Sequence, residues 1–580
     1  MPGHERVIVL KLGGSVLRSA GSLRLAVHEI YRWRRAGHPV VAVVSALGGE
    51  TDELLRESRR ACAHPAPGSV AAAVALGELK SASLLGLHLD RAGVSASVLS
   101  PAGVGFIAQG DPLDADPVAL DGPRLARALE RDGAVVLPGY VACDRDGRTV
   151  VLGRGGSDLT ALVVASSLPG ARCRLVKDVD GLYERDPAGA IPRPRRYARA
   201  TWEDALAAAG SIVQHKALLF ARARGLAFEL GRLNGARPTR IGARSTRWSD
   251  AQDRPARLCV ALLGLGTVGG GVHELLRDVE ELEVVRIAVR GRAAGRGVDP
   301  SLVTREVLDA ARSGADVVVE LIGGLEPARA AVAAALSAGA HVVTANKRLL
   351  AAHGAHLRSL AQRCGRSLLC SAAVGGSAPL LERVRARPPE AVRRVRGVLN
   401  GTTNFVLERI AAGVGLHAAV REARERGFAE SDPALDLSGE DAADKLCLIA
   451  SEMGLVSIGP SSVRREALCE RSALRARGRA GLRHVACLER TAGGARARVA
   501  LEETAEDDPL HRVAAEHSAA VIELSDGTRE VVRGKGAGRW PTAEAVVADL
   551  LELARGSPRA PAHGMSTGTI TARMNGMRAE

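Results

Sequence analysis

Aromatic side chains make up only 2% of this 580-residue sequence. Hydrophobic residues as a whole reach 46%, so the cores must be built from Ala, Val and Leu. The net charge of +14 would suit a nucleic-acid partner, but the arginines lack interleaved aromatics for base stacking and match no recognition module. We therefore expect solvated arginine-rich surfaces, anionic small-molecule substrates and no nucleic-acid partner.

Long apolar runs and paired cysteines are also missing. No stretch reaches 18 uninterrupted apolar residues, and an apolar strand begins at about Val7, so we expect neither a membrane span nor a signal peptide. The nine cysteines include no C-x-x-C pair and are odd in number, which argues for reduced thiols over disulfides or a zinc site. These features predict a cytoplasmic protein.

Two glycine-rich strings are present, each directly after an apolar strand. KLGGS, Lys11–Ser15, places a lysine beside two glycines, which suits binding of phosphate oxygens by backbone N–H groups and one cation. LLGLGTVGG, Leu262–Gly270, has the dinucleotide-binding spacing of Gly264, Gly266 and Gly269. The sequence therefore predicts a phosphate-transfer half fused to a redox half.

The strand and helix patterns divide the chain in the same way. Apolar strands alternate with Ala/Leu/Arg helical segments from residue 7 to about 242, and again from Leu258 to about Leu381, as in largely parallel α/β sheets. Between them, Ser245–Arg257 is polar and without periodicity, which predicts a linker. After the prolines at 388 and 389, strands mix with long helices, as expected for a substrate domain.

Six strings in the first half resemble the aspartate kinase branch of the amino-acid kinase family. They are KLGGS (11–15), VVSALGGETDELL (43–55), LGELKSASLL (76–85), VVLPGYV (135–141), VLGRGGSDLTALVVASSL (151–168) and KDVDGLYERDP (177–187). The resemblance implies ATP-dependent phosphorylation of L-aspartate to 4-phospho-L-aspartate, with Mg²⁺ accompanying ATP. Phosphoryl transfer to a carboxylate brings like charges together, so such a site needs cations and N–H donors.

The resemblance also assigns residues. Lys11 is the catalytic cation, and Gly48 and Gly49 let backbone N–H groups approach. The substrate residues are Ser45, Glu78 (for the ammonium), Arg154 (for the α-carboxylate), Ser157 and Asp158; the nucleotide residues are Gly13, Gly14, Ser15, Lys177, Asp178, Asp180 and Tyr183.

One departure from the family pattern leaves the kinase activity open. Where the family has a lysine that reaches the phosphates, GSIVQHK has Ile212. Lys177 or Lys216 are the two possible replacements. The alternatives are a first half that only binds ligand or dimerises, or one that uses another acyl or phosphoryl acceptor.

From Leu258 to about Arg555 the chain resembles homoserine dehydrogenase. The strings are GLGTVGGGV (264–272), VVVELIGG (317–324), VVTANKRLLA (342–351), AAVGGSAPLL (372–381), LNGTTNFVLERI (399–410), GFAESDPALDLSGEDAADKLCLIA (427–450) and GKGAGRWPTAEAVVADLL (534–551). The resemblance implies NAD(P)H-dependent reduction of L-aspartate 4-semialdehyde to L-homoserine. Arg290, after the second strand, favours a 2′-phosphate and hence NADPH, with NADH possible.

Reducing an aldehyde needs a proton donor at oxygen, which a lysine can supply. The resemblance makes Lys347 and Lys445 catalytic, and Asp441 shares a helix face with Lys445 four residues on. The other substrate residues are Asn400, Gly401, Thr402, Glu430 and Asp436; the cofactor residues are Gly264, Gly266, Thr267, Val268, Gly269, Arg290, Gly323, Thr344 and Lys347. Carbonyls of Val374 and Gly376 match a family Na⁺ site, although Ser371 replaces the usual glutamate beside it.

Together these patterns predict an amino-acid-kinase α/β sandwich, a Rossmann domain and an α+β substrate domain. The predicted units are a kinase domain (1–244), a linker (245–257), an NAD(P)-binding domain (258–387), a substrate domain (388–535), a helix returning to the nucleotide domain (536–555) and a disordered tail (556–580). Too few residues separate Ile241 from Leu258 for an amino-acid-sensing ACT module. We expect a homo-oligomer, joined through the second half, that serves threonine, methionine and lysine biosynthesis.

Overall fold

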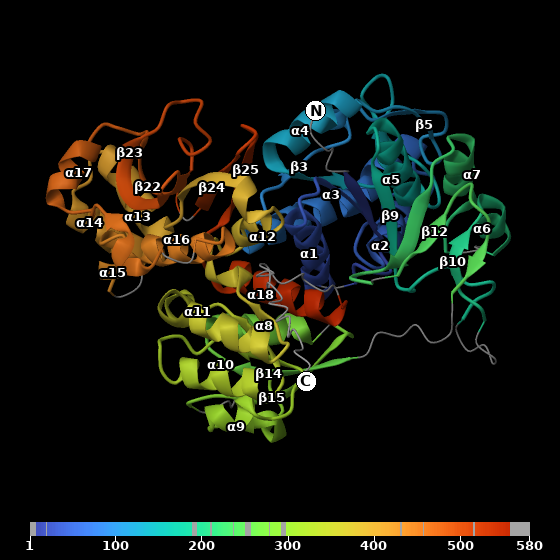
Figure 1. Cartoon of the computed structure of the whole chain (residues 1–580). Helices are drawn as coiled ribbons and strands as arrows, with labels where there is room; N and C mark the ends of the chain where they lie inside the picture. The colour runs from blue at the N-terminus through green and yellow to red at the C-terminus, as the bar shows by residue number, and fades with distance from the viewer. Residues whose placement is uncertain are drawn as a thin grey trace, which may run out of the picture.

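The structure is a computed structural model that describes most of the chain. The described residues are 7–18, 20–187, 194–208, 212–235, 237–249, 257–277, 279–291, 297–429, 432–455, 458–513, 515 and 517–556. Figure 1 shows three bodies: an N-terminal lobe (residues 7–249), a middle domain (257–378) and a C-terminal domain (379–535), with helix α18 (Arg539–Ala554) at their junction. The predicted tail, beyond Gly556, lies outside the described residues.

The N-terminal lobe is built on a nine-stranded sheet of order β13-β10-β12-β11-β9-β1-β2-β6-β3. Its central strands are parallel and fully buried, as expected for continuous apolar runs covered on both faces. The strands are β1 (Ile8–Leu12), β2 (Val40–Val44), β3 (Ser97–Val98), β6 (Ala134–Pro138), β9 (Arg172–Lys177), β10 (Tyr197–Ala200), β11 (Phe228–Arg232), β12 (Thr239–Ile241) and β13 (Arg247–Trp248).

Helices cover this sheet, and a small second sheet of order β5-β4-β7-β8 lies beside it. The helices are α1 (Ala20–Arg35), α2 (Glu50–Ala61), α3 (Pro67–Ala92), α4 (Gly122–Asp132), α5 (Gly156–Ser167), α6 (Trp202–Ala208) and α7 (His215–Ala223). The small strands are β4 (Ile107–Gln109), β5 (Asp116–Ala119), β7 (Val141–Cys143) and β8 (Thr149–Val151).

Helix α3 is long and apolar enough to cross a membrane by length and composition, but half of its apolar stretch is buried inside the lobe. Its buried side chains, which include Leu85 and Leu89, belong to the core that also contains β1 and β2. This arrangement is that of a core helix of the lobe.

The predicted linker differs from the structure at its start. Arg247 and Trp248 form β13, antiparallel to β10 at the edge of the large sheet. Trp248 stacks on Tyr197 with ring centroids 4.2 Å apart, a contact that the polar sequence around Trp248 does not reveal. Residues 250–256 lie outside the described residues.

The middle domain is a six-stranded parallel sheet of order β16-β15-β14-β17-β18-β19, which confirms the predicted Rossmann architecture. Its strands are β14 (Leu258–Leu263), β15 (Leu282–Ala288), β16 (Val303–Thr304), β17 (Val317–Glu320), β18 (His341–Thr344) and β19 (Leu368–Leu369). Its helices are α8 (Thr267–Leu276), α9 (Val307–Ala311), α10 (Ala328–Ser337) and α11 (Lys347–Arg363).

The C-terminal domain pairs helices with a mostly antiparallel sheet of order β21-β23-β22-β20-β24-β25, in agreement with the predicted α+β class. Its strands are β20 (Val392–Val398), β21 (Arg464–Arg465), β22 (Leu482–Thr491), β23 (Gly494–Glu503), β24 (His517–Leu524) and β25 (Arg529–Lys535). Its helices are α12 (Leu380–Arg385), α13 (Gly401–Ala411), α14 (Leu416–Glu425), α15 (Ala434–Leu437), α16 (Glu440–Glu452) and α17 (Glu470–Ala476).

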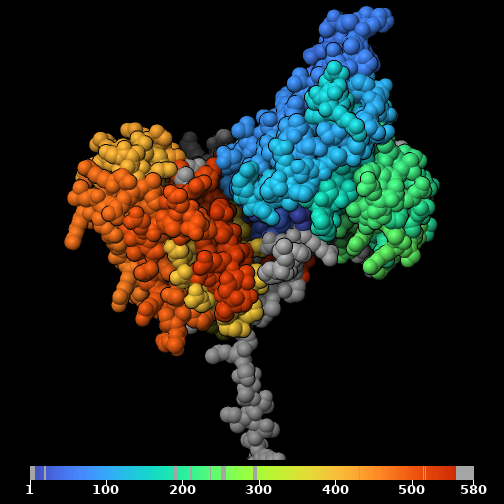
Figure 2. Space-filling model, turned by 90° about the horizontal axis from the view of Figure 1, so that it is seen from above, coloured from blue at the N-terminus to red at the C-terminus, as the bar shows by residue number. Residues whose placement is uncertain are grey.

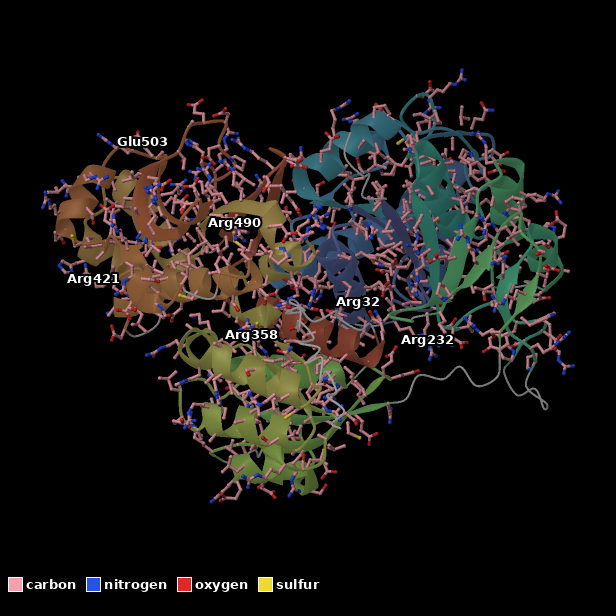
Figure 3. All side chains as sticks on the ribbon, viewed as in Figure 1. Arg32, Arg232, Arg358, Arg421, Arg490 and Glu503 are labelled. Carbon is pink, nitrogen blue, oxygen red and sulfur yellow. The ribbon has the colours of Figure 1, made fainter. Side chains whose placement is uncertain are left out.

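The N-terminal lobe packs firmly against the rest of the chain. Apolar side chains of α1 and α18 belong to one continuous core with those of α8 and β14. Arg35 of α1 is buried and binds Asp549 and Ser371, and Arg232 pairs with Glu280 at 2.5 Å. Figure 2 shows this lobe (blue to green) beside the orange C-terminal domain, and Figure 3 shows arginines spread over all parts, with Arg32 near α18.

Candidate active sites

A cleft of about 920 Å³ opens in the N-terminal lobe, beyond the carboxyl ends of the parallel strands β1, β2 and β9. Ligand sites of open α/β sheets form at such strand ends. Most residues predicted for the kinase site line this one cleft: Lys11, Gly14, Ser15, Ser45, Gly48, Gly49, Glu78, Arg154, Ser157, Asp158 and Lys177. The six sequence strings therefore converge on a single cavity.

At the base of this cleft one carboxylate holds two ammonium groups. Asp158, on the first turn of α5, lies 2.9 Å from the Lys11 Nζ and 2.8 Å from the Lys177 Nζ. Burial raises the pKa of Asp158, but the two lysines outweigh burial and lower it overall. Burial also lowers the pKa of Lys177 to about 8, which Asp158 only partly offsets. The cluster carries one excess positive charge toward the cleft when both lysines are protonated.

Glycine and glutamate complete this part of the cleft. A Cβ at Gly13 would lie 2.8 Å from the Lys11 Nζ, so a larger residue there would displace the ammonium. Glu78 is only 3% exposed, and its Oε2 atom has no hydrogen-bond partner among the described residues. Burial raises the pKa of Glu78 to about 7. A buried carboxylate that lines a cavity and has an oxygen without a partner suits an ammonium ligand.

The structure separates the two candidate replacements for the lysine missing at Ile212. Ile212 and Lys177 both line the cleft, whereas Lys216 pairs with Asp114 and Asp116, at 2.8 and 3.1 Å. Lys177 is therefore the replacement cation that the geometry supports.

Four predicted nucleotide residues do not line the cavity itself: Gly13, Asp178, Asp180 and Tyr183. Asp178 pairs with Arg18 at 3.2 Å, and the Tyr183 hydroxyl donates to Asp180 at 2.9 Å. Tyr140 and Gln214, which sequence reasoning missed, do line it. Tyr140 has a positive φ of 68°. The sequence signal that could have identified it as a site residue is the motif PGYV, which contains it.

In the middle domain the three fingerprint glycines lie in a turn from β14 into α8. Gly264 has a φ of +102°, and a Cβ at Gly269 would lie 2.1 Å from the Gly264 carbonyl oxygen. A Cβ at Gly266 would meet nothing within 4 Å, so this face of the turn is open. Tight turn, open phosphate face and close helix packing are what a dinucleotide pyrophosphate requires, and Thr267 and Val268 begin the helix that follows.

Where the middle and C-terminal domains meet, a second carboxylate holds two ammonium groups. Asp441, on α16, lies 2.8 Å from Lys347 Nζ and 2.7 Å from Lys445 Nζ. Lys445 is 6% exposed and also donates to the Leu399 carbonyl oxygen at 2.5 Å, while the side chain of Lys347 is 37% exposed. The predicted pairing of Asp441 with Lys445 on one helix face is present.

Attraction between opposite charges shifts the pKa values of Asp441 and Lys347. Burial alone would raise the pKa of Asp441, but Lys445 and Lys347 outweigh it and hold that pKa well below its usual range. Burial alone would lower the pKa of Lys347, but Asp441 outweighs it and raises that pKa. Counted over these three side chains alone, one positive charge is left over, while Asp436 and Asp444 also raise the pKa of Lys347.

The predicted substrate residues surround these lysines. The Asn400 side-chain amide donates to Asp436 at 2.7 Å and to Asp441 at 2.8 Å, while its carbonyl accepts from the Thr403 N–H at the start of α13. Gly401 is the first residue of that helix, and the Thr402 hydroxyl donates to the Phe428 carbonyl. Glu430 lies outside the described residues.

A buried acid that sequence reasoning missed holds the cofactor loops. Glu320, fully buried at the end of β17, accepts from the Gly323 N–H at 3.1 Å and from the Thr344 hydroxyl at 2.6 Å. Asn346 donates to the Gly324 carbonyl and caps α11, whose first residue is Lys347. The signal available was the charge that ends the apolar strand VVVE.

Arg290 and Ser371, two further positions singled out in the sequence, lie outside the lysine cluster. Arg290 is exposed, two residues beyond β15, whose end pairs with the end of β14. Ser371, beside Val374 and Gly376, accepts from Arg35 at 3.0 Å and donates to Asp549 at 2.8 Å. The Ser371 hydroxyl is therefore engaged with the N-terminal lobe.

Comparisons with known proteins match both halves of the chain. A model of the amino acid kinase family matches residues 6–226, the homoserine dehydrogenase NAD-binding domain matches 264–371, and homoserine dehydrogenase matches 379–551. The homoserine dehydrogenases of Synechocystis sp. and Corynebacterium glutamicum are 33% and 35% identical, each over 51% of this chain and 72% of the relative. A solved homoserine dehydrogenase from Thiobacillus denitrificans is 34% identical over 52% of this chain and 73% of that one, with a TM-score of 0.48. The chain thus belongs to the homoserine dehydrogenase family and carries an N-terminal amino acid kinase domain.

Proposed function

We propose that the second half reduces L-aspartate 4-semialdehyde to L-homoserine with NADPH. The observation that carries this proposal is the cluster of Lys347, Asp441 and Lys445, in which two ammonium groups share one carboxylate beside the nucleotide domain. The excess positive charge stabilises the alkoxide that forms when hydride reaches the aldehyde carbon.

NADPH, when bound, supplies the hydride from its nicotinamide ring. Because the pKa of Lys347 is raised, its ammonium stays protonated at neutral pH and can give a proton to the developing alkoxide. Lys445 is held in place by Leu399 and Asp441, so it orients and polarises the carbonyl oxygen. Asp436 and Glu430 bind the substrate's ammonium group.

The preference for NADPH over NADH rests on Arg290. A guanidinium beyond the end of the second Rossmann strand suits a 2′-phosphate, whereas an acid there would suit a free ribose hydroxyl. Arg290 is exposed and close to the fingerprint turn, since the Gly264 N–H donates to the Ala288 carbonyl at 2.9 Å.

The test is NADPH oxidation by the purified chain with L-aspartate 4-semialdehyde as substrate. Lys445→Met should lower kcat by a factor on the order of 100 or more, the usual cost of losing a group that acts in the transition state. Lys535→Met, which removes a lysine outside the cluster, serves as the control. Full activity in Lys445→Met would contradict the assignment.

We also propose that the first half phosphorylates L-aspartate with ATP and Mg²⁺. Lys11 and Lys177 would bind the phosphates, Glu78 the substrate ammonium, and Arg154 its α-carboxylate. What supports this is that the cleft holds two lysines on a buried aspartate, so a second cation is available despite Ile212.

ATP-dependent aspartyl hydroxamate formation tests this activity. The chain should form hydroxamate, and Lys11→Met and Lys177→Met should each abolish it, while Lys216→Met should retain most of it. If the unmodified chain forms none while its dehydrogenase is active, the first half is a binding module or uses another acceptor.

The remaining proposals concern a bound cation, the location of the protein and its oligomeric state. Na⁺ ligation by Val374 and Gly376 carbonyls, a cytoplasmic location and a homo-oligomer joined through the dehydrogenase half follow from the family resemblance. Dehydrogenase rates in Na⁺ against choline buffers, and sedimentation of the intact chain, check the first and last of these.

A further inference from the structure

A second large groove, of about 910 Å³, lies between the N-terminal lobe and the middle domain. One wall is the fingerprint turn and the exposed face of α8, and the other comes from the first turn of α1. The lining residues are Gly21, Arg24, Leu265, Gly266, Thr267, Gly270, His273, Glu274, Arg277 and Arg539. The kinase domain thus forms part of a cavity that opens on the dinucleotide-binding turn.

The charges in this groove are unbalanced. Three guanidinium groups, of Arg24, Arg277 and Arg539, line it together with one carboxylate, that of Glu274. Glu274 forms ion pairs with both Arg24 and Arg539, the latter at 2.8 Å. One carboxylate therefore neutralises only one of two guanidinium groups, which come from different parts of the chain. The groove therefore favours an anion.

The surroundings of Arg91 and His273, next to the groove, are also positively charged. Arg91 stacks over Trp540 at 4.4 Å, and Arg539 stacks over the same ring at 4.8 Å. Burial, and then repulsion from Arg24 and Arg539, lower the pKa of Arg91. Burial and Arg277 lower the pKa of His273, which adds no positive charge at neutral pH.

The groove also offers room at the point where phosphates bind. The backbone of Gly266 faces open space, and a Cβ on Gly270 would lie 3.9 Å from the Arg539 Nη2. The Arg539 guanidinium is therefore next to the first turn of α8, whose free N–H groups attract anions. Backbone donors, guanidinium groups and space meet at one end of the groove.

We propose that Arg24 of the kinase domain and Arg539 bind the phosphates of the dinucleotide cofactor, so that the kinase domain completes the cofactor site of the dehydrogenase. This inference rests on the proposed dehydrogenase function. Its consequence is that cofactor affinity depends on how the N-terminal lobe docks on α8.

The experiment measures dissociation constants of NADPH and NADH by nicotinamide fluorescence on the intact chain. Arg24→Ala and Arg539→Ala should each weaken NADPH about tenfold, the value expected for losing one charge-assisted hydrogen bond. Arg24→Lys should recover part of the affinity. Arg131→Ala, an exposed arginine of α4 paired with Asp132 at 2.8 Å, is the matched control and should bind like the unmodified chain.

The two cofactors distinguish which phosphate is bound. Equal weakening of NADPH and NADH assigns the arginines to the diphosphate, and weakening of NADPH alone assigns them to the 2′-phosphate; both support the proposal. If both alanine variants bind both cofactors within twofold of the unmodified chain, the proposal is overturned while the dehydrogenase assignment stands. If the unmodified chain neither binds nor oxidises NADPH, the function itself fails.

Discussion

The same arrangement of three side chains occurs in both halves of the chain. In each, a buried aspartate near the start of a helix forms ion pairs with two lysines. Asp158 holds Lys11 and Lys177 in one half, and Asp441 holds Lys347 and Lys445 in the other. Each arrangement keeps two like charges close together and leaves one positive charge for an anionic substrate or alkoxide. We therefore expect the loss of either carboxylate to lower activity as the loss of a lysine does.

Asp441→Asn tests this argument in the dehydrogenase. The amide keeps the shape but loses the charge, so the two ammonium groups repel each other with no carboxylate between them. We expect kcat to fall by a factor on the order of 100, with NADPH affinity little changed. Asp309→Asn, which removes a surface carboxylate paired with Arg286, should be active; equal rates for the two variants would refute the argument.

Glu78→Gln tests the kinase cleft through pH. The pKa of Glu78 is raised to about 7 from 4.5, so the folded state gains stability from the proton below pH 4.5 and loses it as pH rises through 7. At pH 8 the amide should therefore raise the free energy of unfolding by at most about 3 kcal/mol, and with it the melting temperature. At pH 4.5 the variant and the unmodified chain should melt at the same temperature.

The same variant should lose aspartate binding. In the unmodified chain the KM for aspartate should fall as pH rises from 6 to 8 and Glu78 ionises, whereas Glu78→Gln should show a high KM without this dependence. A normal KM in Glu78→Gln would show that Glu78 does not bind the ammonium.

At the scale of elements, the helices α1 and α18 join the two halves. Arg35 of α1 contacts Asp549, Glu382, Glu552 and Ser371, and Asp549 is fully buried. Removing one partner of a buried pair leaves an uncompensated charge, which costs about 3–5 kcal/mol.

Arg35→Ala should therefore lower the melting temperature and separate the unfolding of the N-terminal lobe from that of the remainder. Differential scanning calorimetry measures this, with the exposed Arg59→Ala of α2 as control. An unchanged single transition in Arg35→Ala would mean that the apolar contacts of the junction are sufficient.

The sequence predicts the buried strands and the glycine turn, but not the contacts between domains. Continuous apolar runs such as VIVL and RLCVALL gave β1 and β14, because buried parallel strands leave a clear pattern. Glycine spacing gave the fingerprint turn, and motif order gave the kinase cleft. Arg24 and Arg35 could not be found in this way, since their contacts depend on residues hundreds of positions away and on packing between domains. Glu320 was missed although a charge at the end of the apolar strand VVVE marks it, because its partners Gly323 and Thr344 become evident only in the folded domain.

At the scale of the whole molecule, the two proposed reactions are not consecutive. The acyl phosphate made by the first half must be reduced to an aldehyde before the second half can use it. The purified chain supplied with L-aspartate, ATP and NADPH should therefore form no homoserine until a semialdehyde dehydrogenase is added, as chromatography of the products would show. Homoserine formed without that enzyme would require an additional activity in this chain.

The central claim is that one chain carries two independent catalytic clusters. The most direct measurement assays aspartyl hydroxamate formation and NADPH-dependent semialdehyde reduction side by side in the unmodified chain, Lys11→Met and Lys445→Met. The account predicts both activities in the unmodified chain, only reduction in Lys11→Met and only hydroxamate formation in Lys445→Met. Loss of both activities in either folded variant, or absence of hydroxamate from the unmodified chain, would contradict it.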